Sequence, residues 1–266
     1  MFRSSVFLAS GMRRTAWRVV FLAMALGAAC TAPDAELRVM SSGGLHAAYT
    51  ELLPELEQAT GRRLVTFRGA SMGTDPNAIP MRLARGEATD VLIMVGYALD
   101  SLIQSGQVVP DSRVDLAHSG IGMVVRAGGA KPDISTLEAL ERTLLDAASI
   151  AYSASASSRY LSTELFPQLG IAEQLEAKSR EVVGERVGEV VARGEAEIGF
   201  QQISELLPIL GVDFVGPLPP EVQKITVYAA GVAAGAEQPE AARRLIRFLA
   251  DSGGSAISRS GMEPVG

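Results

Sequence analysis

Four short runs of small or polar residues could bind an anion, and each follows a short apolar stretch of the sequence. The residues that these runs contribute as ligand-binding candidates are Ser41, Ser42, Gly43, Gly44, Ser71, Met72, Ser153, Ser155, Ser157, Ser158, Gln201 and Gln202. Serine hydroxyls and free backbone N–H groups bind oxyanions, and glycine lets the backbone approach a ligand closely. The pattern therefore indicates a site for a small anionic ligand.

The run over residues 153–158 shows the pattern in full. A short apolar stretch leads into it, and the amphipathic segment 160–166 follows. The first turn of a helix has free N–H groups and partial positive charge. Serine is also a favoured N-cap, so an ordinary capped helix explains this run equally well by itself. The same order of strand, small residues and helix at 36–56 favours the anion-site interpretation.

Charged side chains near these runs could add specificity. Arg82 and Arg159 stand close to two of them, with Tyr160 next in the chain. Arginine binds carboxylates in a bidentate way, although a solvent-facing helix charge is the commoner explanation for either arginine by itself. His46, just after the first run, is the candidate base if the protein is an enzyme. Weaker options for that role are Tyr160, Glu185 and Glu205.

Two other kinds of enzyme are disfavoured. Residues 69–73 fit the G-x-S-x-G pattern of serine hydrolases, but that motif requires a helix directly after the turn, and residues 75–77 intervene. The chain has two histidines and one cysteine and lacks an H-E-x-x-H motif. We therefore expect a ligand-binding loop at Ser71, no metal and no cofactor.

The first 30 residues are predicted to be an export signal. Three arginines within residues 13–18 precede an apolar run over residues 19–29, which is too short to span a membrane. Translation could start at Met1 or at Met12. The sequence predicts a periplasmic protein with residues 1–30 as its signal peptide.

Cys30 is the only cysteine, so an intramolecular disulfide is excluded. The residues before it resemble a bacterial lipoprotein cleavage site, except that Gly27 stands where leucine is expected. Lipid attachment at Cys30 and ordinary signal cleavage nearby both stay open.

Composition limits the class of partner. The chain has 266 residues, of which 47% are apolar, and removal of residues 1–30 leaves 20 basic and 30 acidic residues, a net charge of −10. It contains no basic block of the kind that binds nucleic acids. We expect a soluble α/β protein that is a monomer and does not bind nucleic acid.

Apolar spacing predicts alternating strands and helices. The expected strands lie near residues 36–40, 64–68, 90–95, 121–125, 150–152, 197–200, 214–216 and 222–232. The expected helices lie near residues 45–56, 79–85, 99–109, 135–145, 160–166, 171–177, 187–193 and 239–249. Residues 84–88 and 192–196 share Ala-Arg-Gly-Glu-Ala before a strand. We interpret this repeat as one helix–strand unit used once in each of two lobes.

The order of these motifs over residues 36–266 resembles the type II periplasmic solute-binding proteins of the molybdate-binding kind. The residues that carry the resemblance are Ser41–Ser42, Ser71–Gly73, Leu83–Glu87, Asp90–Val91, Gln201–Gln202, Leu249–Ser252 and Ser260–Met262. The resemblance implies a two-lobed α/β fold, in which each lobe is a mostly parallel sheet flanked by helices and a cleft lies between the lobes. It assigns residues 36–117 plus 224–266 to lobe one and residues 118–223 to lobe two. The hinge would lie near residues 118–125 and 222–230.

This resemblance implies a solute-binding protein that delivers a small anion to an inner-membrane ABC permease. The two arginines, and Gln201–Gln202 where the family usually has a tyrosine, favour an organic polycarboxylate over molybdate. Residues 79–87, 153–160 and 199–202 are also similar to bacterial aconitate isomerases, which are periplasmic enzymes on this fold. A binder and an isomerase of trans- and cis-aconitate would use nearly the same loops, so both functions stay open.

Overall fold

The computed structural model describes residues 36–265. The predicted export signal and Cys30 lie outside the described residues. The strands form two sheets. The first sheet has the order β11 (Glu263–Pro264), β4 (Val114–Ser119), β10 (Thr226–Val232), β3 (Val91–Val95), β1 (Glu36–Ser41) and β2 (Arg63–Arg68). The second has the order β7 (Ser179–Val182), β6 (Ile150–Ser153), β8 (Ile198–Gln202), β5 (Ile121–Arg126) and β9 (Val212–Pro217).

Each sheet has a parallel part and an antiparallel part. Strands β1, β2 and β3 are parallel, as are β6, β7 and β8. These are the strands that follow or precede helices, as parallel connections require. In contrast, β10 pairs antiparallel with β3 and β4, and β5 pairs antiparallel with β8 and β9. The sheets are therefore mixed, because β5 and β10 arrive from the other sheet without a crossover helix.

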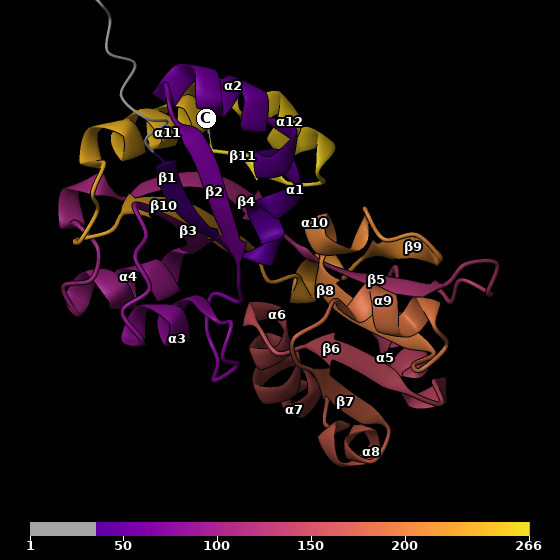
Figure 1. Cartoon of the computed structure of the whole chain (residues 1–266). Coiled ribbons are helices and arrows are strands. Elements are labelled where there is room, and N and C mark those ends of the chain that lie inside the picture. Colours follow the sequence, from indigo (N-terminus) through magenta and orange to yellow (C-terminus); the bar gives the residue numbers. More distant parts are fainter. Residues whose placement is uncertain (1–35, 266) are drawn as a thin grey trace, which may run out of the picture. The chain divides into compact units, whose positions relative to one another are not determined.

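Helices cover both faces of each sheet. In the first part of the chain and at its end, they are α1 (Gly43–Glu51), α2 (Leu53–Thr60), α3 (Ile79–Ala84), α4 (Gly96–Gln104), α11 (Pro239–Ser252) and α12 (Gly254–Arg259). Around the second sheet they are α5 (Leu137–Asp146), α6 (Ala156–Tyr160), α7 (Phe166–Gln168), α8 (Ala172–Glu176), α9 (Val187–Ala192) and α10 (Ile203–Leu206). Figure 1 shows α2, α11 and α12 on one side of the first sheet and α3 and α4 on the other.

Two predicted helices are divided in the structure. The helix after β1 consists of α1 and α2, which meet at Leu52, with Pro54 in the first turn of α2. Proline is tolerated there because the N–H that it lacks has no intrahelical acceptor. Gly61 ends α2 in the left-handed conformation, with φ of 64°, as its sequence position predicts. The predicted helix over 160–166 is a π-helical segment, Leu161–Leu165, between α6 and α7.

The apolar cores explain why the strands hold their positions. All five residues of β3 are buried, as expected for a central strand covered on both faces. In the second sheet, Ile150 and Phe200 pack with residues of α5 to α8, while α9 packs its valines against the opposite face. Full burial of each such side chain contributes about 1.5–3 kcal/mol. These cores fix the strand ends from which the polar loops emerge.

The chain passes between the sheets twice. It leaves the first sheet after β4 and enters the second at β5, with Gly120 between them. It returns between β9 and β10, through residues 218–225. Gln223 links these passages, because its side chain accepts a hydrogen bond from the Ile121 N–H (2.8 Å) and donates one to the Ile121 carbonyl (2.9 Å). The exact lobe boundaries, 117/118 and 223/224, stay predictions.

Candidate functional site

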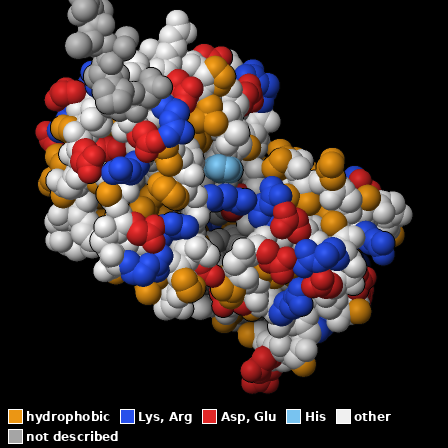
Figure 2. Space-filling view, in the orientation of Figure 1, with side chains coloured by type: hydrophobic (Ala, Val, Ile, Leu, Met, Phe, Trp, Pro, Cys, Tyr) orange, Lys and Arg blue, Asp and Glu red, His pale blue; other side chains and the backbone are white. Residues whose placement is uncertain are grey.

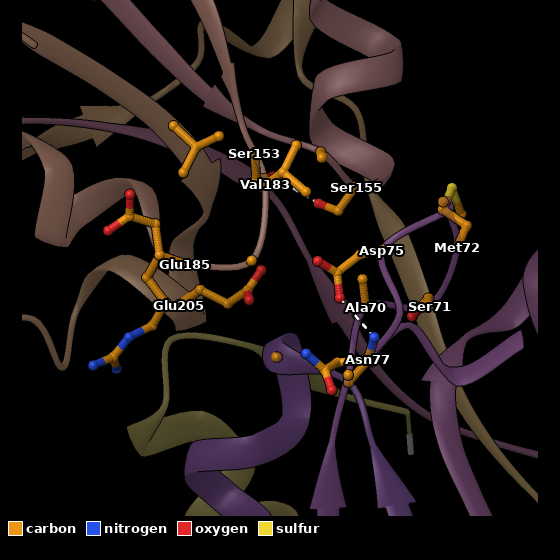
Figure 3. A pocket seen from close by; sticks show the side chains of 18 of the residues that line it. Ala70, Ser71, Met72, Asp75, Asn77, Ser153, Ser155, Val183, Glu185 and Glu205 are labelled. Carbon is orange, nitrogen blue, oxygen red and sulfur yellow. Dashed lines mark hydrogen bonds between the residues drawn. The ribbon is translucent and has the colours of Figure 1, made fainter. Parts of the chain in front are cut away.

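A cavity of about 470 Å³ is lined by residues from both sheets. Apart from Tyr228, which is on β10, its lining residues lie at or beyond the carboxyl ends of the six parallel strands, β1, β2, β3, β6, β7 and β8. This is where ligands bind in open α/β sheets. Figure 3 shows side chains from the loop after β2, from the end of β6, from the loop after β7 and from α10 directed towards one space.

The N-terminus of α1 forms one wall of the cavity. Ser42 is its N-cap residue, but the Ser42 side chain does not cap the helix. Ser42 is only 3% exposed, and within residues 36–265 its hydroxyl has no hydrogen-bond partner. Its backbone N–H donates to the Ile93 carbonyl (2.8 Å), which holds the loop against β3. The first-turn N–H groups and this buried hydroxyl are hydrogen-bond donors that could bind an anion without rearrangement.

Gly43 and Gly44 are glycines because other groups occupy the space of a side chain. A Cβ atom on Gly43 would lie 1.7 Å from Glu205 Oε1. A Cβ atom on Gly44 would lie 2.3 Å from the Tyr228 hydroxyl oxygen and 2.2 Å from its ring carbon Cζ. The absence of two side chains thus brings a carboxyl group and a phenol directly against the first turn of α1.

Glu205 is the buried acid of the cavity. It lies on α10 and is 9% exposed, with its Oε1 atom 3.8 Å from an Arg68 guanidinium nitrogen. Burial raises the pKa of Glu205, against the charges of Arg68 and Arg186 and a hydrogen bond from Gln201. The neutral carboxyl is therefore favoured more strongly here than on the surface, and the carboxylate that forms on ionisation is a stronger base.

Gln201 holds this acid in place from the end of β8. It is 4% exposed, and its Oε1 atom accepts a hydrogen bond from the Val187 N–H (3.0 Å). That contact leaves the amide nitrogen of Gln201 for the Glu205 carboxyl. Tyr228, on β10, is buried to 3% exposure, and burial followed by the charge of Glu205 raises its pKa well above 10. Its phenol is accordingly a proton-bearing hydrogen-bond donor at neutral pH.

Charged side chains of both signs line the cavity. Arg68 and Arg186 line it together with five acidic residues, Asp75, Glu181, Glu185, Glu189 and Glu205. Glu185 pairs with Arg193 (2.8 Å), and Glu189 accepts a hydrogen bond from Arg186 Nε (2.9 Å). Figure 2 shows basic and acidic side chains together around the hollow in the middle of this face. Arg68 and the α1 N-terminus lie beside Glu205 and carry full and partial positive charge, which favours anions at this end of the cavity.

The loop after β2 lines the cavity and is not a nucleophile elbow. The Ser71 hydroxyl oxygen accepts a hydrogen bond from the Val95 N–H (3.0 Å), and residues 69–78 separate β2 from α3. A nucleophile elbow requires a helix directly after the serine. Met72 lies beside Tyr97, whose hydroxyl is 3.6 Å from the sulfur. The loop is closed by the Asn77 N–H, which donates to the Asp75 carboxylate (2.7 Å), as drawn in Figure 3.

The serine run over 153–158 contributes Ser153 and Ser155 to the cavity. Its hydroxyls bond to one another: Ser153 Oγ is 2.6 Å from Ser155 Oγ and 2.9 Å from Ser157 Oγ. Ser157 is fully buried and does not line the cavity. The backbone of Ser158 belongs to α6. This run is therefore internally satisfied, in contrast with Ser42.

The structure brings seven of the sequence-predicted binding residues together at the cavity. They are Ser42, Gly43, Ser71, Met72, Ser153, Ser155 and Gln201. Outside the lining are Ser41, Gly44, Arg82, Ser157, Arg159, Tyr160 and Gln202, while the Ser158 side chain is outside the described part of the structure. Gly44 still shapes the site through its contact with Tyr228. The binding role of all these residues stays a prediction.

The residues outside the lining have other contacts. Arg82 Nη1 pairs with Glu87 (2.6 Å), and Arg159 is exposed on α6. The Tyr160 hydroxyl donates to the Val222 carbonyl (2.7 Å), at the return passage between the sheets. The side-chain amide of Gln202 and the Thr226 hydroxyl are 3.0 Å apart, also at that passage. Tyr160 and Gln202 thus connect structural segments.

His46 lies on α1 outside the lining. Burial, followed by the charges of Arg68 and Arg186, lowers its pKa, so the imidazole is neutral at pH 7. Its Nδ1 atom is buried, with no hydrogen-bond partner among the residues that the structure describes. A catalytic role for His46 stays a prediction.

Sequence reasoning did not single out Arg68, Arg186 and Tyr228, and it ranked Glu205 low. Arg68 directly ends β2, and the rule that placed the small residues at strand ends could have found it. Tyr228 is inside a long apolar strand, where a phenol has no distinguishing signal. Glu205 approaches Gly43 only through the contact of α10 with α1, which is a tertiary feature.

Within residues 36–265, no group of three or more His, Cys, Asp and Glu side chains could hold a metal ion. None of the helices in the same range is both long and apolar enough to cross a membrane.

Comparisons with known proteins agree with this geometry. Residues 37–263 match a family model described as bacterial extracellular solute-binding protein. The chain is 50% identical, over 88% of its length and 89% of the relative's, to a Pseudomonas sp. protein described as aconitate isomerase.

Solved structures with the same fold include the periplasmic molybdate-binding protein of Azotobacter vinelandii, with a TM-score of 0.67, 19% identity, and coverage of 85% of this chain and 98% of that one. Peb3 from Campylobacter jejuni has a TM-score of 0.61, 11% identity, and coverage of 85% and 99%. These matches confirm the predicted fold class, that of the type II periplasmic binding proteins. At these identities they carry the fold alone.

Proposed function

Because the chain belongs to the family of bacterial extracellular solute-binding proteins, we propose that it uses the cavity of that fold as an active site, as an isomerase of trans- and cis-aconitate. The observation that carries this proposal is the 50% identity to an aconitate isomerase over most of both chains. The family also supports an exported protein that acts in the periplasm. In this proposal the solute-binding fold supplies recognition, and a few side chains add proton transfer.

The reaction requires a base and a conjugated carbon framework. Aconitate carries a methylene group next to a carboxylate and one bond away from its carbon–carbon double bond. If a base removes a methylene proton, the electron pair spreads over the allylic carbons and the carboxylates. Return of a proton to the former vinyl carbon places the double bond at the former methylene position, and the new double bond can be cis or trans. No oxidant, reductant or metal is needed for this balance.

The inner end of the cavity supports recognition of such a substrate. Three carboxylates need several donors, and the site offers Arg68, Arg186 and the N-terminus of α1 with Ser42. Hydrogen bonds to charged groups contribute about 1.5–3 kcal/mol each, before the cost of ordering the ligand. The volume of about 470 Å³ lies within the range that small-molecule ligands occupy.

A binding protein that delivers a small anion to an ABC permease is the second candidate. The family description supports it, and recognition alone would use the same donors. The two functions differ in whether bound ligand changes chemically. Glu205, a buried acid in contact with the helix that would bind the anion, favours the isomerase, because a side chain that repels an anion when it is ionised is a poor choice for a site that only binds anions.

Proton NMR of the purified protein with trans-aconitate in heavy water tests the proposal. We expect signals of cis-aconitate to grow in proportion to protein concentration, with deuterium entering the methylene group. Line broadening of trans-aconitate without conversion would instead establish the binding protein. Spectra of trans-aconitate that stay unchanged at an equimolar protein concentration would overturn both functions for this tricarboxylate.

A further inference from the structure

Glu205 lies beside the first turn of α1, where a bound substrate carboxylate would also place the carbon atom attached to it. An anion bound by Ser42 and the first N–H groups of α1 would sit beside Gly43, and Glu205 Oε1 already lies within 1.7 Å of the position of a Gly43 Cβ atom. If the bound carboxylate is the one attached to the methylene group, the carbon next to it is the one that must lose a proton. A base for this step must therefore stand close to Gly43.

We propose that Glu205 is the base that removes the methylene proton from the substrate, and that the N-terminus of α1 stabilises the negative charge that then develops on the adjacent carboxylate. This assignment rests on the proposed isomerase function. In the step, the C–H bond breaks, an O–H bond forms on Glu205, and the electron pair moves into the allylic system. The proton, or one exchanged from solvent, then returns to the far allylic carbon and regenerates the carboxylate of Glu205.

The surroundings of Glu205 suit this role. Its carboxyl faces Arg68, Arg186, Gln201 and Tyr228 from four different elements. Burial raises its pKa and so makes its carboxylate a better base, while the charges of Arg68 and Arg186 oppose this rise and favour the carboxylate. Charge developing on the substrate meets donors already in place, namely the Ser42 hydroxyl and the α1 N–H groups, without any reorganisation.

Tyr228 is a second donor at the same place. Its hydroxyl oxygen lies 2.3 Å from the position of a Gly44 Cβ atom, so it faces the same turn of α1 as Glu205. Its high pKa keeps the phenol protonated, and it can donate to the substrate carboxylate but not abstract a carbon-bound proton. Because Gly43 and Gly44 have no side chains, Glu205 and Tyr228 can both approach an anion bound at this turn, Glu205 as a proton acceptor and Tyr228 as a hydrogen-bond donor.

The test compares Glu205→Gln with the full-length wild-type protein. Glutamine keeps the shape and cannot take the proton. We expect the variant to lose at least about 1,000-fold in kcat, in line with removal of a general base. Deuterium exchange into the methylene group should be lost as well, while the Kd for trans-aconitate changes less than about threefold. Glu164→Gln is the matched control, because Glu164 is half exposed, pairs with Lys224 (3.3 Å) and does not line the cavity.

A pH profile separates a base from a structural acid. We expect kcat/KM to decrease as the pH is lowered, because Glu205 becomes protonated, and burial should place this decrease at a higher pH than for an ordinary carboxyl group. In Arg68→Gln the decrease should occur at a still higher pH, since the charge of Arg68 lowers the pKa of Glu205. Conversion by Glu205→Gln at more than a tenth of the wild-type rate would overturn the assignment while leaving the isomerase function intact. Absence of conversion by the wild-type protein would reject both.

Discussion

Two strand-to-helix turns look alike in the sequence and differ in the structure. The first turn, residues 41–44 leading into α1, leaves a buried hydroxyl and the helix N-terminus unpaired. The serine turn, residues 153–157 leading into α6, satisfies its hydroxyls internally through Ser153. An unpaired buried polar group costs stability, so it persists where a ligand completes it. From this difference we expect the first turn to contribute more to anion binding than the serine turn, which also lines the cavity.

Among substitutions within the two turns, the largest effect should come from filling the first turn. In Gly44→Ala, the new Cβ atom would lie 2.2–2.5 Å from three atoms of the buried Tyr228 side chain, which cannot move away cheaply. We expect a loss of about 1–3 kcal/mol in the free energy of unfolding, in the range for overpacking. Conversion of trans-aconitate should fall more than 100-fold, as expected when a substrate is misplaced. Urea unfolding and NMR assays measure these two effects.

Gly235→Ala is the control for this substitution, because a Cβ atom there meets nothing within 4 Å. It should leave both the unfolding free energy and the conversion rate close to wild type. A Gly44→Ala protein with wild-type activity would show that the phenol is not held against the first turn.

The arginines beside the two turns should differ in their effect on affinity. Arg68 lines the cavity beside the first turn, whereas Arg159 is exposed on α6 after the serine turn. We expect Arg68→Gln to raise the Kd for trans-aconitate about 10- to 100-fold, which corresponds to the loss of a charged hydrogen bond. Arg159→Gln should change it less than threefold. Isothermal titration calorimetry measures both, and a larger effect for Arg159 would reverse the assignment of the two turns.

The serines of the two turns should give opposite patterns. The Ser42 hydroxyl makes no hydrogen bond within residues 36–265, so in Ser42→Ala stability should stay unchanged while the Kd rises about three- to tenfold. In Ser153→Ala, two hydroxyl contacts are lost, so the unfolding free energy should fall by about 1 kcal/mol while the Kd changes little. Urea unfolding and calorimetry on the same preparations distinguish these patterns. A stability loss in Ser42→Ala would indicate a partner for its hydroxyl.

The sequence predicted the two-lobed fold class and the strand ends at which the cavity lies. Strand β3 is continuously apolar and α11 has a clear helical periodicity, so local patterns were sufficient for such elements. Seven of the predicted binding residues line the cavity because the carboxyl ends of parallel strands converge.

The charged groups of the site could not be predicted in the same way. Arg82 was favoured because of its position near the loop. It pairs instead with Glu87, because the chain turns back after α3 ends at Ala84 and brings Glu87 next to Arg82. Glu205 and Tyr228 come to the first turn from α10 and β10, through contacts between residues more than 150 positions apart in the chain. Local sequence carries no information on such contacts without the fold.

The smallest expected effect is a pH dependence of stability that originates at the first turn. Because the folded-state pKa of Glu205 is raised, its contribution to stability is complete below the unfolded value of about 4.5 and is lost as pH rises through the folded value. Glu205→Gln removes this loss, so its Tm should exceed that of the wild-type protein by more at pH 8 than at pH 5. Glu164→Gln, near the serine turn and half exposed, should shift Tm equally at both pH values. A Glu205→Gln protein less stable than wild type at pH 8 would instead assign Glu205 a mainly structural role between α10 and α1.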